Sequence, residues 1–253
     1  MKVALLVFLA RYYYKIPADH VSQIKYIFAP VFALFVPVLL VATQPDLGTA
    51  VLILAGGVAV IWLAGFRMKY FLYSSLVFIC LLPVGISFLK PYQKSRILTF
   101  LNPERDPLGA GYQIIQSKIA IGSGGIFGKG YLQGSQSYLD YLPEKHTDFI
   151  FTLFSEEFGF FGSTGLLFIY TLIIYRIIVI GNQARNNFAR LYCFGFAASF
   201  FIYVAVNMMM VLGLLPIVGA PLPIMSYGGS SMLSMMIGLG IVMSCKVHQQ
   251  TAV

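Results

Sequence analysis

The chain has 253 residues, of which 58% are hydrophobic and 10% are charged. A soluble domain carries about 25% charged residues, so this composition excludes an ordinary soluble domain and indicates a membrane protein. The net charge of +8 does not indicate nucleic-acid binding, because the basic residues form no dense patch and lie in small groups between apolar runs, as membrane topology and lipid headgroups require.

Apolar runs predict the membrane spans. A spanning helix needs about 20 predominantly apolar residues, and the runs at 47–66 and 70–89 contain no charged residue. The stretch 191–245 is also free of charge but too long for one span, and "LLPIVGAPLPIMSYGGSS" divides it. We expect an all-α polytopic membrane protein, one membrane domain over residues 1–253, with about seven transmembrane segments: 1–14 (short), 24–42, 47–66, 70–89, 149–180 (with room for a break), 191–215 and 229–245.

The charges predict the orientation of these spans. Short loops rich in Lys and Arg stay in the cytoplasm. If the turn after the first segment is cytoplasmic, alternation of the spans places the basic groups near 11–25, 67–69, 176–190 and 246 inside, with one acid, Asp19. The other eight of the nine acids then lie outside. The long connection 90–148, between the fourth and fifth spans, is therefore predicted to be extracytoplasmic.

The connection 90–148 is unusually long. Loops beyond roughly 15 residues are usually functional or disordered, and its many Ile, Leu, Phe and Tyr residues argue against disorder. Tyr112, Ile115 and Ile119 follow helical spacing, which predicts a helix lying in the membrane interface with Gln113, Gln116 and Lys118 toward polar groups.

Five of the nine acids crowd into "YLDYLPEKHTDFIFTLFSEEFG", residues 138–159. Asp148 precedes the apolar run "FIFTLF", where an acid can cap a helix and complement its dipole. The same carboxylate, partly desolvated by Phe149 and Phe151, can instead act as a base, and the two interpretations are compatible. His146 can orient that carboxylate, or be a surface histidine without a role.

Glu156 and Glu157 enter the same apolar run. Acids inside a membrane segment are candidates for function. The alternative is a structural ion pair with a basic residue such as Lys118 or Lys145.

Two further polar groups interrupt the apolar runs. Gln44 and Asp46 lie in "TQPDLGTA", which fits either a substrate contact or a turn in which Asp46 caps the next helix. Ser226 and Ser230 lie in "PIMSYGGSSM", where small residues allow close helix packing or the backbone binds a headgroup. The three cysteines show no disulfide or metal-binding spacing, so no metal-ligating residues are predicted.

Several blocks together resemble the SEDS family (shape, elongation, division and sporulation), in the family's order and spacing. They are "ATQPDLGTA", "RILTFLNPERDPLGAGYQIIQSKIAIGSGGIFGKG", "LPEKHTDFIFTLFSEEFGFFG" and "GLLPIVGAPLPIMSYGGSS". "QSKIAIGSGG", "GKG" and "KHTDFIF" are more similar to the rod-shape members than to the division members.

The resemblance implies a peptidoglycan glycosyltransferase in the bacterial cytoplasmic membrane. Such proteins polymerise lipid II on the outer face, beside a class B penicillin-binding protein and other membrane proteins of the elongation complex. The family's essential acid matches Asp148. Because a lipid diphosphate is already a good leaving group, one base suffices, and Arg96 and Lys118 are expected to meet the diphosphate. A divalent cation, Mg²⁺ or Mn²⁺, can share that task.

One departure from the family pattern concerns length. Family members generally have ten spans, so the resemblance predicts that about three are missing upstream of this chain, together with the glutamate expected before Lys2. Two other functions stay open on the residues alone. These are a flippase or transporter for lipid-linked precursors, and an inactive scaffold for a penicillin-binding protein.

Overall fold

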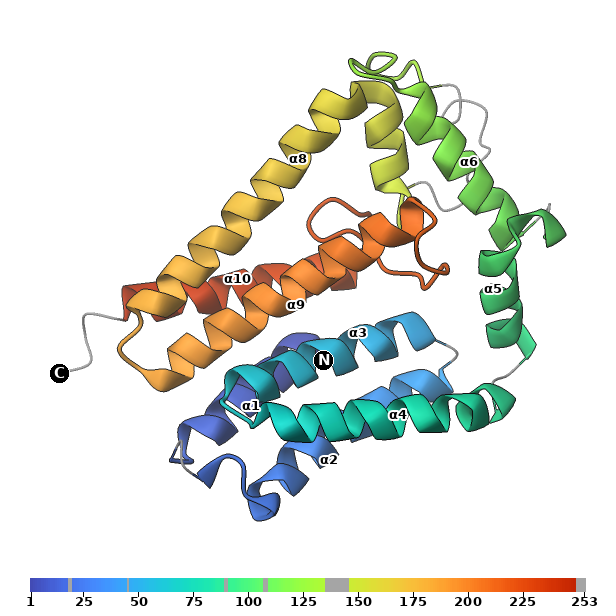
Figure 1. Ribbon diagram of the computed structural model, residues 1–253. Coiled ribbons are helices and arrows are strands. Elements are labelled where there is room, and N and C mark those ends of the chain that lie inside the picture. Colours follow the sequence, from blue (N-terminus) through green and yellow to red (C-terminus); the bar gives the residue numbers. More distant parts are fainter. Residues whose placement is uncertain (18–19, 45, 89–90, 107–108, 135–145, 249–253) are drawn as a thin grey trace. The chain divides into compact units, whose positions relative to one another are not determined.

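The computed structural model describes residues 1–17, 20–44, 46–88, 91–106, 109–134 and 146–248. Within these ranges the regular structure is helical (Figure 1), as predicted. The helices are α1 (Lys2–Tyr14), α2 (Ile24–Thr43), α3 (Leu47–Leu63), α4 (Met68–Phe88), α5 (Pro91–Leu101), the short 3-10 helix η2 (Pro103–Arg105), α6 (Ala110–Ser123), α8 (Ile150–Gln183), α9 (Asn187–Val211) and α10 (Gly229–Val247).

A helix occupies each of the seven predicted membrane segments. Four of the described helices are long and apolar enough to cross a bilayer, namely 25–43 within α2, α8, α9 and α10, and α3 is a shorter apolar helix. Large apolar side chains such as Phe32, Phe168 and Phe201 are exposed on these helices, as lipid contact requires. The chain is therefore a multi-pass membrane protein.

The chain divides into two compact units, each described here by itself. Unit 1 comprises Met1–Ser74, Thr171–Tyr203 and Gly229–Val253, and unit 2 comprises Ser75–Tyr170 and Val204–Gly228. The long helices α4, α8 and α9 each contribute residues to both units.

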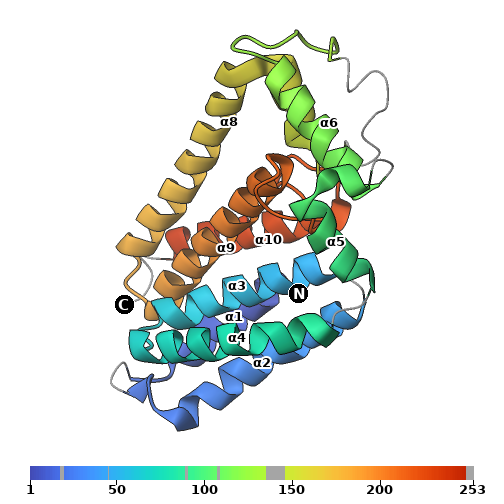
Figure 2. The ribbon, with the colours of Figure 1, turned by 45° about the vertical axis from the view of Figure 1, so that its right-hand side comes forward.

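In unit 1, α1 packs against α2, α3 and α10 (Figure 2). Small residues permit this close packing: a side chain at Gly57 would collide with Leu34 of α2, and one at Gly238 of α10 with Phe196 of α9. Leu9, Val60 and Tyr192 are fully or almost fully buried. Unit 1 is thus a bundle of apolar helices.

In unit 2, the described part of the predicted extracytoplasmic connection contains the helices α5, η2 and α6, which pack on one another. The prediction of a helix around Tyr112–Ile119 is confirmed by α6. Its buried side carries Gly111, Ile114, Ser117 and Ala120, whereas Ile119 is exposed. The Ser117 hydroxyl donates to the carbonyl of Val211 at 2.8 Å and accepts from Thr152, which joins α6 to α9 and α8.

Helix α8 is broken at Gly159, whose φ of +65° lies outside the helical range, so the predicted break is confirmed. The loop 124–130 satisfies the peptide groups that the break leaves without helical partners. Phe160 N–H donates to Gly125 O at 2.9 Å and Phe161 N–H to Ile126 O at 3.2 Å. In return, Glu156 O and Glu157 O accept from the N–H groups of Lys129 and Gly130, both at 3.0 Å. Away from water, each unsatisfied group would cost several kcal/mol.

Glycine is required where this loop crosses α8. A side chain at Gly159 would collide with the nitrogen of Gly128, and one at Gly128 with the carbonyl oxygen of Glu157. Both glycines also have positive φ, of +65° and +80°. We refer to the loop 124–130 and the α8 residues it contacts as the kink clasp.

Candidate functional site

Asp148 lies two residues before α8, in the turn that leads into the helix. Phe149 and Phe151, which follow it, are 1% and 5% exposed and anchor the start of the helix in the core of unit 2. Asp148 itself is only partly buried. Asp148 therefore belongs to a firmly packed helix start without being fully buried itself.

Three successive backbone carbonyls hold this turn in place. His146 O accepts from the N–H of Tyr227 at 2.9 Å, Thr147 O from the hydroxyl of Ser226 at 2.7 Å, and Asp148 O from the side-chain amide of Asn207 at 2.8 Å. Two of the three donors come from the loop 212–228, between α9 and α10. We call this set of bonds the carbonyl clamp.

Asn207 on α9 connects the clamp to the loop 212–228. Its amide also donates to Ala220 O at 2.6 Å, and the residue is fully buried. Sequence reasoning missed Asn207. The signal was present, since Asn207 is an uncharged but strongly polar residue in the long apolar stretch 191–215, where an amide needs a specific partner.

The loop 212–228 also brings a cation near the carboxylate. A guanidinium N–H of Arg96, from α5, donates to Ile217 O at 3.1 Å. Two residues along the loop, a Cβ built on Gly219 would lie 3.6 Å from Asp148 Oδ2, so the carboxylate lies beside this glycine. Arg96 has five N–H donors, and one bond to Ile217 does not consume them. The structure thus brings Asp148 and Arg96 to the same short stretch of loop.

Two other predicted site residues in unit 2 take different positions. His146 is exposed, and the bond described for it is made by its backbone carbonyl, so its role toward the carboxylate stays a prediction. Lys118 is exposed on α6 and lies against Gly213, at the start of the loop 212–228. Its proposed contact with a diphosphate likewise stays a prediction.

Ser226 is a buried part of the carbonyl clamp. Its hydroxyl accepts from Leu222 N–H at 2.6 Å while donating to Thr147. These bonds give it a structural task, and its predicted role in substrate binding is not tested.

The remaining predicted site residues, Gln44, Asp46 and Ser230, belong to unit 1. Asp46 caps α3 by accepting from Thr49 N–H at 3.0 Å, as the capping interpretation predicted. Gln44 and Ser230 are exposed. Asp140, Glu144 and Lys145 lie outside the described residues.

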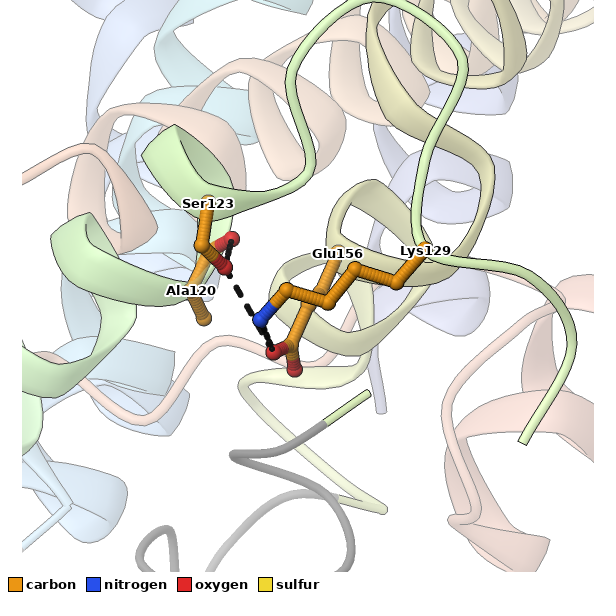
Figure 3. Close-up of polar contacts among 4 residues, drawn as sticks. All are labelled: Ala120, Ser123, Lys129 and Glu156. Atoms are coloured by element: carbon orange, nitrogen blue, oxygen red, sulfur yellow. Dashed lines mark hydrogen bonds and ion pairs between the residues drawn. The ribbon is translucent and has the colours of Figure 1, made fainter. Parts of the chain in front are cut away.

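Glu156 forms a buried ion pair within the kink clasp (Figure 3). Its Oε1 lies 2.6 Å from Nζ of Lys129 and 3.5 Å from the Ser123 hydroxyl, and its side chain is 0% exposed. The structural interpretation of Glu156 is confirmed, but the basic partner found here is Lys129 rather than the suggested Lys118 or Lys145. The mistake arose because the clasp folds Lys129 back onto α8, which sequence separation does not reveal.

The described residues offer little support for a protein-bound metal. No three His, Cys, Asp or Glu residues among them form a group that could hold an ion. A divalent cation shared with the diphosphate of a substrate needs only one or two carboxylates and stays a prediction.

Comparison with known proteins places the chain in a family. The family model described as cell cycle protein, FtsW/RodA/SpoVE, matches residues 1–251. The peptidoglycan glycosyltransferase MrdB of Escherichia coli K12 is 48% identical over 218 residues, which are 86% of this chain and 59% of MrdB. The chain thus spans less than two thirds of the length of this relative.

Solved structures agree with this result. A chain from a peptidoglycan synthase complex, in a study of the structural coordination of polymerization and crosslinking, is 35% identical with a TM-score of 0.80, over 99% of this chain and 69% of that one. RodA of Thermus thermophilus is 26% identical with a TM-score of 0.66, over 98% of this chain and 64% of RodA. From the family match over almost its whole length and these similarities, the chain belongs to the FtsW/RodA/SpoVE family, the SEDS proteins that its motifs resemble.

Proposed function

We propose that the protein is a peptidoglycan glycosyltransferase that polymerises lipid II, with Asp148 as the general base. The observation that carries the proposal is the convergence of Asp148 and Arg96 on residues 217–219, with the backbone of Asp148 held by the carbonyl clamp. A positioned carboxylate and a cation that lie against the same short loop suit a reaction that removes a proton and releases a diphosphate. The peptidoglycan glycosyltransferase MrdB, at 48% identity, supports the same chemistry.

The reaction needs one base and one anion-binding group. The oxygen of the acceptor sugar's 4-hydroxyl forms a bond to the anomeric carbon of the donor, while the bond from that carbon to the lipid diphosphate breaks. The diphosphate leaves with the electron pair, and the hydroxyl proton passes to the Asp148 carboxylate. Attack from the face opposite the leaving group inverts the linkage from α to β. Arg96, joined by Lys118, stabilises the negative charge of the departing diphosphate.

The proposal includes a location and a partner. The protein would lie in the bacterial cytoplasmic membrane with Asp148 on the extracytoplasmic face, where the positive-inside rule places the acids. It would act beside a class B penicillin-binding protein that crosslinks the strands. The similarity to a chain of a peptidoglycan synthase complex supports such an assembly.

The test is polymerisation of fluorescent lipid II by the protein purified with its penicillin-binding partner, whose transpeptidase is blocked by a β-lactam. Wild type should give a ladder of glycan strands on a gel, and Asp148→Asn should give none. Glu157→Gln is the matched control, because it makes the same carboxylate-to-amide change on α8, the helix that Asp148 precedes.

Undiminished strands from Asp148→Asn would overturn the catalytic assignment. Transfer of lipid II across liposome membranes without any glycan would instead identify a flippase. A wild-type protein that neither polymerises nor transfers lipid II, yet stays bound to its partner, would identify a scaffold.

A further inference from the structure

Unit 1 contains a cavity of about 310 Å³ that the proposed function does not use. It is formed where α1 and α3 end and α9 begins. Its walls combine apolar side chains, including Ile16 and Leu63, with the polar groups of Tyr13, Asn187 and Arg190. This mixture suits a ligand with one charged end and one apolar end.

The charge around the cavity is strongly positive. Cationic residues lie near the end of α1, around the start of α4 and around the start of α9: Arg11, Lys15, Arg67, Lys69, Arg185 and Arg190. Among the described residues of unit 1 the only acid is Asp46, which caps the opposite end of α3. Asp19, in the turn after α1, lies outside the described residues. An anion is therefore the favoured ligand.

The start of α9 adds to this preference. The Asn186 side chain accepts from Phe188 N–H at 2.9 Å and fixes the first turn of a helix of 25 residues, whose N-terminal end attracts anions. The Arg190 guanidinium is exposed, lies 5.9 Å from the ring centroid of Phe194 and lines the cavity. No ion pair joins Arg190 to any other residue that the structure describes.

Tyr13 supplies an independent indication of a ligand. The residue is 5% exposed and lines the cavity, and its buried hydroxyl has no hydrogen-bond partner within the described structure. Leaving a buried hydroxyl without a partner costs about 1–3 kcal/mol. A ligand oxygen that reaches this hydroxyl would remove the cost by accepting the bond.

We propose that the cavity binds the phosphate of an anionic phospholipid, with Arg190 and Tyr13 donating to its oxygens. Ile16, Leu63 and Phe194 then contact the first carbons of the lipid chains. The apolar walls favour a lipid over a free phosphate compound, although both share the phosphate chemistry. Neither Asp148 nor the carbonyl clamp takes part, so the site stands independently of the proposed enzyme activity.

The experiment measures lipid retention by native mass spectrometry and melting temperature in a neutral detergent. Phosphatidylglycerol should be retained and should raise the melting temperature. Phosphatidylcholine should do neither. Inorganic phosphate at about 10 mM, a concentration high enough to reveal binding with a Kd near 1 mM, should do neither as well. Arg190→Gln should weaken phosphatidylglycerol binding about tenfold, the size expected for one charge-assisted bond. Arg190→Lys should restore part of it.

Arg67→Gln is the matched control, because it removes one exposed charge that does not line the cavity. Equal losses from Arg67→Gln and Arg190→Gln would show diffuse attraction to a basic surface and overturn the site. Tyr13→Phe should weaken binding while making the lipid-free protein more stable than wild type, because it removes the unpartnered buried hydroxyl. Unchanged binding would overturn the placement of the phosphate. Stabilisation by inorganic phosphate alone would overturn the lipid as occupant in favour of a soluble phosphate compound.

Discussion

Two carboxylates lie at the two ends of the short helical piece 150–158, and their surroundings differ. Glu156, near the end of this piece, is buried, and its carboxylate forms an ion pair with Lys129 in the kink clasp. Asp148, just before its start, is held through its backbone carbonyl while its carboxylate lies beside Gly219, which has no side chain to cover it. The comparison teaches that an acid near a membrane can be fixed in two ways. Glu156 is fixed through its side chain, and Asp148 is held through its backbone carbonyl.

Asp148→Asn gives the sharpest test of this contrast. Because the carbonyl clamp uses only the backbone of residue 148, the variant should melt at the wild-type temperature. Loss of the base should lower the polymerisation rate by roughly 10²–10⁴-fold. Lipid II polymerisation and a thermal melt of the same sample measure both quantities. A large fall in melting temperature would show that the carboxylate, like that of Glu156, is structural.

Lys129→Met should produce the largest loss of stability, about 3–5 kcal/mol, since it leaves the buried Glu156 carboxylate without its cation. The double variant Lys129→Met/Glu156→Met should recover most of that loss, because an apolar pair of similar volume needs no desolvated charge. Thermal unfolding in detergent compares the two, with the exposed Lys246→Met as the control. Equal instability of the single and double variants would contradict a specific ion pair.

Asn207→Asp should destabilise the protein by about 2–3 kcal/mol, since it replaces the amide that donates to one buried and one partly buried carbonyl. It should also lower kcat for polymerisation more than it raises KM, because it moves Asp148 without touching substrate. Steady-state kinetics separate these parameters, and the same change at the exposed Asn182 is the control. A change confined to KM would place Asn207 in substrate binding instead.

Asp46→Ala should have the smallest effect. It removes the cap that accepts from Thr49 N–H, for which the expected loss is about 1 kcal/mol of stability with little change in the polymerisation rate. Thermal unfolding and the lipid II assay measure the two. Asp46→Asn, which keeps a capping oxygen, should behave as wild type. A strong loss of activity in Asp46→Asn would show that the Asp46 carboxylate contacts the substrate, as the alternative interpretation predicts.

The helices were predictable because each depends on its own sequence. Runs without charge predict α2, α3 and α4, and "FIFTLFSEEFGFFG" predicts the long α8. The spacing of Tyr112, Ile115 and Ile119 predicts α6. In these cases local periodicity and bilayer thickness suffice.

The contacts were less predictable because they join distant parts of the chain. Lys129 meets Glu156 only after the loop 124–130 crosses the break in α8, and Asn207 meets Asp148 across 59 residues. Ser226 was recognised as polar, but sequence alone does not show that its hydroxyl is occupied by Leu222 and Thr147. The acceptors of the carbonyl clamp are backbone carbonyls. Every residue has one, so the sequence does not show which of them accept these bonds.

The break at Gly159 also divides α8 by length. At 1.5 Å per residue, the part 160–183 is about 36 Å long, close to the roughly 30 Å thickness of a bilayer's hydrocarbon core when tilted, and the part 150–158 is only about 13 Å. The long part can therefore be matched to the lipid while the short part is free to take another direction. The kink clasp binds the peptide groups on both sides of Gly159, so it holds the short part that follows Asp148 at a fixed angle to the long part.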